Sequence, residues 1–391
     1  MHVTFTTAGE SHGKALVCIL EGVPAGLPLL ADDVNRDLTR RMQGYGRGAR
    51  MKIESDQVEF LSGIRAGETL GSPIAMMIAN RDWDHWHDIM AAEPDAAGTE
   101  RRRQVQRPRP GHADLAGCLK YNFHEARYVL ERASARESAA RVAAGGLAKL
   151  LLAQFGIEVL SHVIAVGSVH SRVAATWEQV QAVCAKDDTL FRCVDSEAEV
   201  RMKAAVDEIL RTGDTLGGIF EVIAHGVPAG VGTHANWDER LDGLLAQAVM
   251  SLQAVKAVEI GTGVESAVSL GSTVHDPIDY DREGHRFTRP ENHAGGLEGG
   301  IANGEDIVVR GYLKPISTLR RPLQSVHMET KEAVKAAYER SDVCVVPAAG
   351  VAAEAMIALT VARSFLEKFG GDSLEETRRN FDGYREQVRN F

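Results

Sequence analysis

Two long segments rich in alanine and aliphatic residues constrain the fold of this 391-residue chain more than any other feature. The first covers residues 134–155 and is followed by Gly156, and the second covers residues 351–369 and is followed by Gly370. Glycine directly after an apolar run is typical of a helix C-terminus, so both segments are predicted to be helices. Small side chains allow close helix packing, and the second segment carries several of them: Ala353, Ala355, Ala358 and Ala362.

The remaining segments favour an α+β fold. A third helix is predicted over residues 238–258, and strands are predicted over 3–6, 219–224 and 307–309. Helices and strands do not alternate regularly, which favours antiparallel sheets over a doubly wound parallel sheet. The chain contains neither GxGxxG between a strand and a helix nor GxxxxGK[ST], so a dinucleotide or P-loop site is not expected.

The chain is predicted to form a single domain over residues 1–391. It has no Ser/Pro-rich linker, low-complexity tract or repeat. Residues 372–391 are expected to form a C-terminal helical tail, because Ser373 and Glu376 have the spacing of a capping box. The polar stretch 80–110 is interpreted either as a surface loop or as a lid over a site.

Charge and composition exclude several classes of protein. A formal net charge of −10 argues against nucleic acid as the main partner. The five cysteines form no CxxC pair and are expected to be reduced thiols. The sequence shows neither a signal peptide nor an apolar run of about 18 residues, so we expect a cytoplasmic protein without a membrane partner. Glycine is frequent, at 38 residues against 12 prolines, which indicates ordered turns rather than linkers.

Arginines gather in three stretches that contain small or rigid residues. Residues 40–50 place four arginines among three glycines, which suits phosphate or carboxylate. Residues 107–114 combine arginines with prolines, and residues 131–137 place small side chains between two arginines. A solvated basic turn and ordinary Glu–Arg helix pairs are the alternative interpretations.

Two histidines lie in glycine-containing turns. His12 follows the first predicted strand, and His112 is followed closely by Asp114, which could orient its imidazole. An imidazole exchanges protons near neutral pH, so both histidines are candidates for proton transfer.

Three later stretches complete the candidate site. The Gly-rich residues 292–300 could cradle a phosphate through backbone N–H groups, and residues 314–318 offer a lysine and two hydroxyls. Residues 339–342 supply an arginine and carboxylates before an apolar run, 343–346, that resembles a strand. The chain has no HExxH zinc spacing and no GxSxG elbow, and no metal site is predicted. The residues alone therefore predict an enzyme that handles a phosphate-bearing anion.

Beyond these patterns, the chain resembles the chorismate synthase family. The resemblance rests on motifs that occur in the family's order: TAGESHG (7–13), GYGRG (44–48), RMKIE (50–54), RPGHAD (109–114), ERASARE (131–137), GDTLGG (213–218), NHAGG (292–296) and RSDVCVVPAAG (340–350). Two positions depart from the pattern: His124 stands where Asp is common, and Ala257 where Gly is common.

The resemblance implies a lyase that removes phosphate from 5-enolpyruvylshikimate-3-phosphate (EPSP) by anti 1,4-elimination, giving chorismate at the end of the shikimate pathway. The reaction causes no net redox change but requires reduced FMN, from which an electron is lent and then recovered. His12 would protonate the departing phosphate, His112 would maintain the flavin's protonation state, and Asp342 would act with the flavin in removing the C6 proton. Ser11 and Ser134 would belong to the proton relay.

The resemblance also implies binding residues. Candidates for the phosphate and carboxylates of EPSP are Arg41, Arg47, Arg107, Arg132 and Arg136. Candidates for FMN are Ala133, Ser134, Ala135, Gln253, Ala254, Gly299, Lys314, Pro315, Ile316, Ser317, Thr318 and Arg340.

The family has its own fold, a β-α-β sandwich of antiparallel sheets around a helical layer, and its members are usually homotetramers. An external flavin reductant is expected. Two alternatives remain: a bifunctional form that reduces its own FMN with NADPH, and a flavin-free lyase or transferase that binds phosphate.

Overall fold

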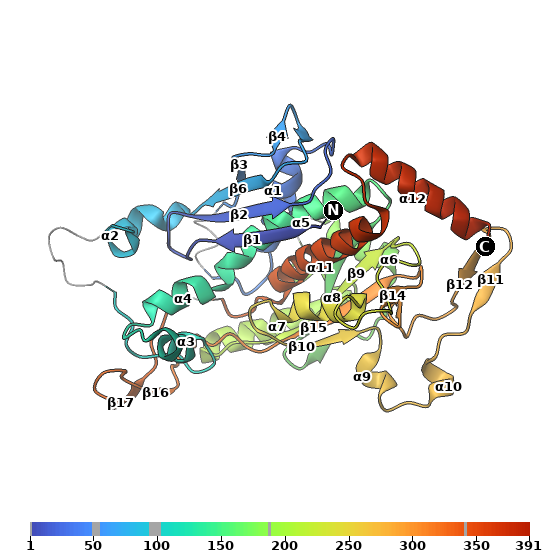
Figure 1. Ribbon diagram of the computed structural model, residues 1–391. Coiled ribbons are helices and arrows are strands. Elements are labelled where there is room, and N and C mark those ends of the chain that lie inside the picture. Colours follow the sequence, from blue (N-terminus) through green and yellow to red (C-terminus); the bar gives the residue numbers. More distant parts are fainter. Residues whose placement is uncertain (1, 49–54, 94–102, 187–188, 340–341) are drawn as a thin grey trace.

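A layer of helices lies between two antiparallel sheets (Figure 1). The computed structural model describes residues 2–48, 55–93, 103–186, 189–339 and 342–391. Every ladder between the described strands of these two sheets is antiparallel. The arrangement confirms the predicted α+β class with sheets on either side of a helical layer.

The smaller sheet has four strands in the order β1-β2-β6-β3. These are β1 (Thr4–Ala8), β2 (Ala15–Glu21), β6 (Ile74–Ala79) and β3 (Val58–Phe60). Leu16, Cys18 and Leu20 alternate along β2 and are at most 1% exposed. This period of two directs one face of the sheet onto the helices.

The larger sheet has five strands in the order β10-β15-β9-β7-β8. These are β10 (Val255–Ile260), β15 (Ile307–Leu313), β9 (Gly218–His225), β7 (Glu158–Val166) and β8 (Val169–His170). The predicted strands near the N-terminus, in β9 and in β15 are confirmed.

Four helices fill the layer between the sheets: α1 (Ala31–Met42), α5 (Ser138–Ala153), α8 (Leu241–Met250) and α11 (Val346–Phe369). α5 and α11 cross so closely that a Cβ on Gly145 would lie 2.2 Å from the Cβ of Ala355. Small residues at this crossing explain the alanine content of both predicted helices. α11 is long and apolar enough to span a membrane, yet 83% of its most apolar window is buried inside the protein.

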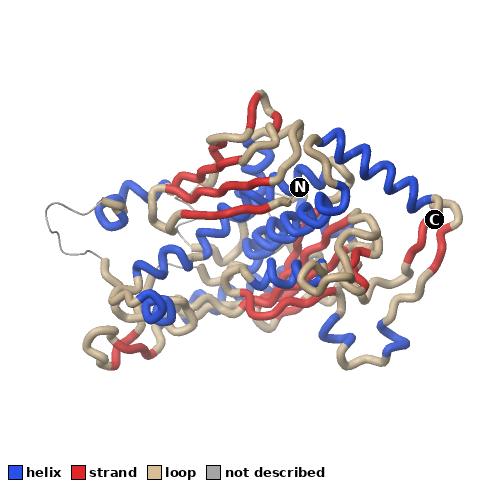
Figure 2. Tube along the Cα trace, viewed as in Figure 1, coloured by secondary structure: helices blue, strands red, loops and turns tan. Residues whose placement is uncertain are grey.

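The remaining elements form connections and extensions around the sandwich (Figure 2). The helical ones are η2 (Arg81–His85), α2 (His87–Met90), α3 (Asp114–Tyr121), α4 (Arg127–Ala133), η3 (Ala135–Glu137), α6 (Trp177–Cys184), α7 (Ser196–Thr212), α9 (Gly263–Ser266), α10 (Gly271–Val274) and α12 (Leu374–Arg389). The short strands are β4 (Ile64–Arg65), β5 (Glu68–Thr69), β11 (Asp279–Asp281), β12 (Arg286–Thr288), β13 (Leu297–Glu298), β14 (Ile301–Ala302), β16 (Gln324–Val326) and β17 (Ala333–Lys335).

The predicted tail helix is confirmed as α12. The hydroxyl of Ser373 accepts the N–H of Glu376, as the capping pattern indicates. The carboxylate of Glu376 accepts the N–H of Asp372 rather than that of Ser373. Of the two hydrogen bonds of the predicted capping box, only the one accepted by the Ser373 hydroxyl therefore forms.

One predicted helix is too long, and one predicted strand is wrong. The helix expected over residues 238–258 ends at Met250, because Ala254 takes a left-handed φ of 71° and the following residues pair with β15. The run 343–346 is not a strand, since α11 begins at Val346 with Pro347 in its first turn. Within the polar stretch 80–110, η2 and α2 are helical, and residues 94–102 lie outside the described part of the chain.

Candidate functional site

The loop between β1 and β2 meets the turn between α4 and α5. The backbone N–H of Ser11 donates to the carbonyl of Glu131 at 3.0 Å, and the Ser134 hydroxyl donates to the Ser11 hydroxyl at 3.2 Å. Ser134 breaks the helical run with an extended ψ of 142° and accepts the N–H of Arg136. Two predicted relay serines, more than a hundred residues apart in sequence, are thereby brought into contact.

His12 is held on two sides. Its Nδ1 lies 2.9 and 3.1 Å from the two carboxylate oxygens of Glu131, whose Oε2 also accepts the His12 N–H at 3.0 Å. Its ring stacks on Trp86 with centroids 3.9 Å apart. The His12 side chain remains 17% exposed, so the imidazole is fixed without being sealed off.

Buried arginines adjoin this loop. Arg136 pairs with Asp56 at 2.5 Å and donates to the amide oxygen of Asn80 at 3.0 Å. The Asn80 amide nitrogen in turn donates to the carbonyls of Glu10 and Gly13. Asn80 therefore connects Arg136 to the loop that carries His12.

Arg41 shares the Asp56 carboxylate with Arg136, at 3.3 Å. Its guanidinium also donates to the Ser138 hydroxyl and to the Ala135 carbonyl, each at 3.0 Å. Burial lowers the pKa of Arg41; the charge of Asp56 opposes this shift, while the positive charges of Arg136 and Arg47 add to it. A bound anion would relieve that crowding of positive charge.

Asp342 lies at the far end of the arginine cluster. Its carboxylate pairs with Arg47 at 3.3 Å and accepts the N–H of Gly48 at 2.5 Å. Arg47 donates to the carbonyl of Arg41 at 3.5 Å. Gly46, with φ of 86°, lets the segment that bears Arg47 lie close to the segment that follows Asp342, because a Cβ on Gly46 would lie 3.1 Å from the Cβ of Cys344. One continuous series of contacts thus runs from the His12 loop to Asp342.

A second group surrounds His112. Its Nδ1 lies 2.5 Å from Asp114, and Arg109 grips the same carboxylate at 2.8 and 3.0 Å. Burial raises the pKa of Asp114, but the hydrogen bonds from His112 and Arg109 outweigh it and hold that pKa well below its usual range. The expectation that Asp114 orients His112 is confirmed. Arg109 also donates to the hydroxyl of Thr318 at 2.9 Å.

Residues 314–318 and 253–254 lie beside this group. The ammonium of Lys314 donates to the Gly111 carbonyl at 2.9 Å, and the backbone N–H of Lys314 donates to the Ala254 carbonyl at 3.0 Å. A Cβ on Gly111 would lie 3.5 Å from the Cβ of Ser317. The Gln253 amide donates to Glu137 at 3.1 Å, one turn beyond Ser134. Most predicted cofactor residues are therefore neighbours.

Other predicted residues lie apart. Arg132 is 42% exposed and donates to the carbonyl and hydroxyl of Thr7. Arg107 is exposed, and its carbonyl accepts the N–H of Ala337. Gly299 lies in the β13–β14 turn, beside the start of α8. Ala254 follows the other end of that ten-residue helix, which is about 15 Å long. Arg340 lies outside the described residues, as do residues 50–54 of the RMKIE motif.

The Gly-rich stretch 292–300 does not present the predicted phosphate cradle at its start. The N–H groups of His293 and Ala294 donate to the Asp276 carboxylate, and those of Gly295 and Gly296 donate to Asn292. These donors stabilise the turn itself. Asp276, Glu291 and His293 place ligand atoms within 4.8 Å of one another, but the Asp276 oxygens already serve this turn.

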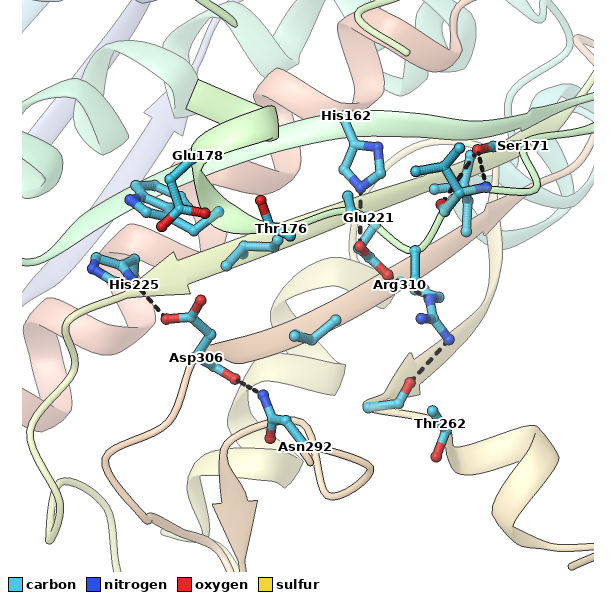
Figure 3. Close-up of a pocket in the computed structure, with 18 of the residues that line it drawn as sticks. His162, Ser171, Thr176, Glu178, Glu221, His225, Thr262, Asn292, Asp306 and Arg310 are labelled. Atoms are coloured by element: carbon cyan, nitrogen blue, oxygen red, sulfur yellow. Dashed lines mark hydrogen bonds and ion pairs between the residues drawn. The ribbon is translucent and has the colours of Figure 1, made fainter. Parts of the chain in front are cut away.

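A cavity of about 700 Å³ opens elsewhere, on the face of the larger sheet away from the helical layer (Figure 3). Glu221 there joins His162 at 2.9 Å to Arg310 at 2.7 Å across three strands. Of the candidate-site stretches singled out in the sequence, only 292–300 contributes to its lining, through Asn292. The candidate site is therefore assigned to the His12 and His112 groups, where most of the predicted residues converge.

Several residues of the site were not among the sequence candidates: Asp56, Asn80, Trp86, Arg109 and Glu131. Arg109 and Glu131 lie within the motifs, and the i,i+4 spacing of Arg127 and Glu131, which form an ion pair in the structure, is a signal that could have found Glu131. Asp56, Asn80 and Trp86 carry no local signal, because their partners lie far away in sequence.

Comparison with known proteins gives a consistent result. The family model for chorismate synthase matches residues 3–366. The chain is 62% identical over 387 residues to the chorismate synthase of Solibacter usitatus and 64% identical over 392 residues to that of Acidobacterium capsulatum, with 99% of each chain covered in both cases. A crystal structure of chorismate synthase has a TM-score of 0.81 at 41% identity, covering 100% of this chain and 99% of that one. The chain therefore belongs to the chorismate synthase family of shikimate-pathway lyases.

Proposed function

We propose that this chain converts EPSP to chorismate and inorganic phosphate by anti 1,4-elimination, with reduced FMN as cofactor. The observation that carries the proposal is the continuous series of contacts that links the loop carrying His12, three buried or half-buried arginines and Asp342. Such a site offers cations for an anionic substrate, an acid for its leaving group and a base for its proton.

The substrate's phosphate and carboxylates are assigned to the arginine cluster. Arg41 and Arg136 are each 5% exposed, and their positive charges repel one another. A bound anion would contact both guanidiniums and offset this repulsion. Arg47 lies next to Asp342 and would face the same ligand. Arg107 and Arg132, which lie at the margin, would contribute charge rather than direct contacts.

Two bonds of the substrate break in the proposed reaction. His12 gives a proton to the departing phosphate as the C–O bond breaks, and the Ser11–Ser134 pair would relay its replacement. Asp342 receives the C6 proton as the new double bond forms. Arg47 and the Gly48 N–H hold the carboxylate for that step.

The residues near Lys314 fit the phosphate of FMN. Burial lowers the pKa of Lys314, and the charge of Lys256 lowers it further, so a bound dianion would offset both effects. Lys314, Ser317 and Thr318 would hold this group, together with Ala133, Ala135, Gln253 and Ala254 around it. His112, held by Asp114, would exchange a proton with the cofactor. Reduced FMN, when bound, supplies an electron-rich ring that assists phosphate loss without net redox change.

The test is phosphate release and chorismate absorbance from EPSP under anaerobic conditions. We expect activity with dithionite-reduced FMN and none with oxidised FMN. Turnover without any flavin would instead support a flavin-free lyase or transferase, and no turnover in any arm would refute the proposal.

A further arm contains NADPH and oxidised FMN. We expect no activity in it, because the proposal includes an external flavin reductant; turnover there would support the bifunctional alternative. We also propose a cytoplasmic homotetramer, because members of the family are usually homotetramers. The molecular mass in solution tests this assembly.

A further inference from the structure

We infer that Glu131 is the positioning residue that fixes the orientation of His12 and the ring nitrogen, Nδ1, that carries its hydrogen. The inference deepens the proposed function, on which the role of His12 rests. Both Glu131 oxygens lie within 3.1 Å of the His12 Nδ1, and Oε2 also accepts the His12 backbone N–H. A carboxylate that binds the ring and the main chain of one residue leaves the imidazole little freedom to rotate.

Glu131 is charged where it lies. It is 2% exposed and pairs with Arg127 at 2.8 Å, and Arg127 pairs with Glu339 at 3.0 Å. Burial raises the pKa of Glu131, but the hydrogen bond and charge of His12 and of Arg127 outweigh burial and hold that pKa below its usual range. The group facing His12 is therefore a carboxylate at neutral pH.

Trp86 fixes the ring in the other direction. It stacks on His12 at an interplanar angle of 22°, and its indole N–H donates to Asp82 at 3.1 Å. The guanidiniums of Arg103 and Arg127 lie 4.4 and 5.1 Å from the indole centroid. The charged groups around His12 on the elements packed against it are Glu10, Asp82, Arg103, Arg127, Glu131 and Glu339.

This geometry assigns one nitrogen to each task. With Nδ1 facing Glu131, the hydrogen on Nδ1 bonds to the carboxylate, and Nε2 is assigned the proton transfer to the substrate. When Nε2 gives up its proton, the hydrogen on Nδ1 stays bonded to Glu131, so the ring keeps its orientation through the step. Glu131 thus acts on the substrate only through His12.

The direct test is ¹⁵N-imidazole NMR of the full-length protein, with the His12 signals identified from their loss in His12→Ala. Glu131→Gln should raise the share of neutral His12 rings that carry the hydrogen on Nε2, because one of the two oxygens that accept from His12 becomes an NH₂ group. An unchanged distribution of the hydrogen between the two nitrogens would overturn the inference.

The chain offers a matched control in Glu221→Gln. Glu221 is also a buried glutamate between a histidine and an arginine, His162 at 2.9 Å and Arg310 at 2.7 Å, but it lies on the outer face of the larger sheet. This variant should leave both turnover and the distribution of the His12 hydrogen between Nδ1 and Nε2 unchanged. A wild-type spectrum needs no variant at all: neutral His12 should carry its hydrogen on Nδ1, and a hydrogen on Nε2 would contradict the inference.

Kinetics separate positioning from general support of the fold. Glu131→Gln should lower kcat about 10- to 100-fold with KM for EPSP within about twofold. In a His12→Ala background, Glu131→Gln should lower kcat by less than about twofold beyond the loss that His12→Ala already causes. Independent, multiplicative losses would overturn the inference, whereas a wild-type protein that never releases phosphate from EPSP would refute the proposed function instead.

Discussion

Asp342 is the residue whose proposed role depends most on its charge. Asp342→Asn retains an oxygen that can accept the Gly48 N–H, but it removes the negative charge that faces Arg47. We expect folding to be preserved and chorismate formation to slow by roughly 10²–10⁴-fold, the range typical of a lost general base. Anaerobic stopped-flow absorbance measures the change.

A matched control for this change is Asp242→Asn. Asp242 also pairs with an arginine, Arg240 at 2.6 Å, but at the start of α8 and away from the arginine cluster. It should leave turnover unchanged. A wild-type rate in Asp342→Asn, with the control also normal, would remove Asp342 from the mechanism.

Lys314 carries the prediction for the cofactor. Its ammonium is partly buried beside the Gly111 carbonyl, and burial, together with the charge of Lys256, lowers its pKa. Lys314→Ala should weaken binding of FMN by about tenfold or more, because a charge-assisted contact to phosphate is lost. Quenching of flavin fluorescence gives the Kd, and Lys335→Ala, on the exposed strand β17, is the control. Equal affinities in both variants would contradict the assignment.

Among the residues of the site, the sequence predicted contacts only between residues that are close together in the chain. Asp114 could be assigned to His112 because they are two positions apart, and the 2.5 Å contact confirms it. The pairing of Arg136 with Asp56 could not be predicted, since 80 residues separate them and only the packing of α5 beside the smaller sheet brings them together. The family resemblance supplied roles, but not the carboxylate partner of His12.

At the scale of elements, the crossing of α5 and α11 sets how far apart the two sheets can be. A Cβ at Gly145 would lie 2.2 Å from the Ala355 Cβ and 2.4 Å from its Cα, so backbone must shift to admit it. Gly145→Ala should therefore lower the free energy of unfolding by about 1–3 kcal/mol despite alanine's higher helix propensity. Thermal unfolding followed by circular dichroism measures the effect.

Gly383 on α12 is the matched control, because its Cβ would meet nothing within 4 Å. Gly383→Ala should raise the free energy of unfolding by up to about 1 kcal/mol through helix propensity alone. If Gly145→Ala were equally stabilising, close packing of the two helices would not be what selects glycine there.

Elements with a strong local pattern were predictable, and those defined by pairing were not. The apolar runs in β9 and β15 and the apolar lengths of α5 and α11 are local signals. Residues 255–260 continue the apolar run of α8, yet they pair with β15 and become strand β10. Tertiary pairing overrode helix propensity there, and no local signal marks the left-handed Ala254 as the break.

At the scale of the whole molecule, a buried ionic network ties the layers together. Glu354 in α11 is fully buried and contacts Arg40 of α1, Lys149 of α5 and the Ser161 hydroxyl of β7, each at 2.7 Å. Arg192 extends the network from the Arg40 carbonyl to the Pro347 carbonyl at the start of α11. The end of α1, which bears Arg41, is thus anchored to α11, which begins shortly after Asp342.

This distribution of buried groups makes stability fall on both sides of neutral pH. The pKa values of Glu131, Glu221 and Glu354 are lowered, because ion pairs with neighbouring cations outweigh their burial. Carboxyl groups with lowered pKa contribute stability that is present above their unfolded values near 4.3 and is lost as pH falls below them. The unfolding temperature should therefore decline below about pH 5.

The alkaline side has a different cause, and it can be tested by substitution. Burial, with a smaller effect of Glu137, raises the pKa of Cys18 to about 12, and burial raises that of Cys344 to about 11. In the unfolded chain these thiols ionise near pH 8.5, so stability is lost as pH rises from there toward the folded values. Unfolding temperatures measured from pH 3.5 to 10.5 should be highest between about pH 5 and 8. Cys18→Ala should make the alkaline decline shallower while leaving the acid decline parallel to wild type, and an equally steep alkaline decline would show that buried thiols do not cause it.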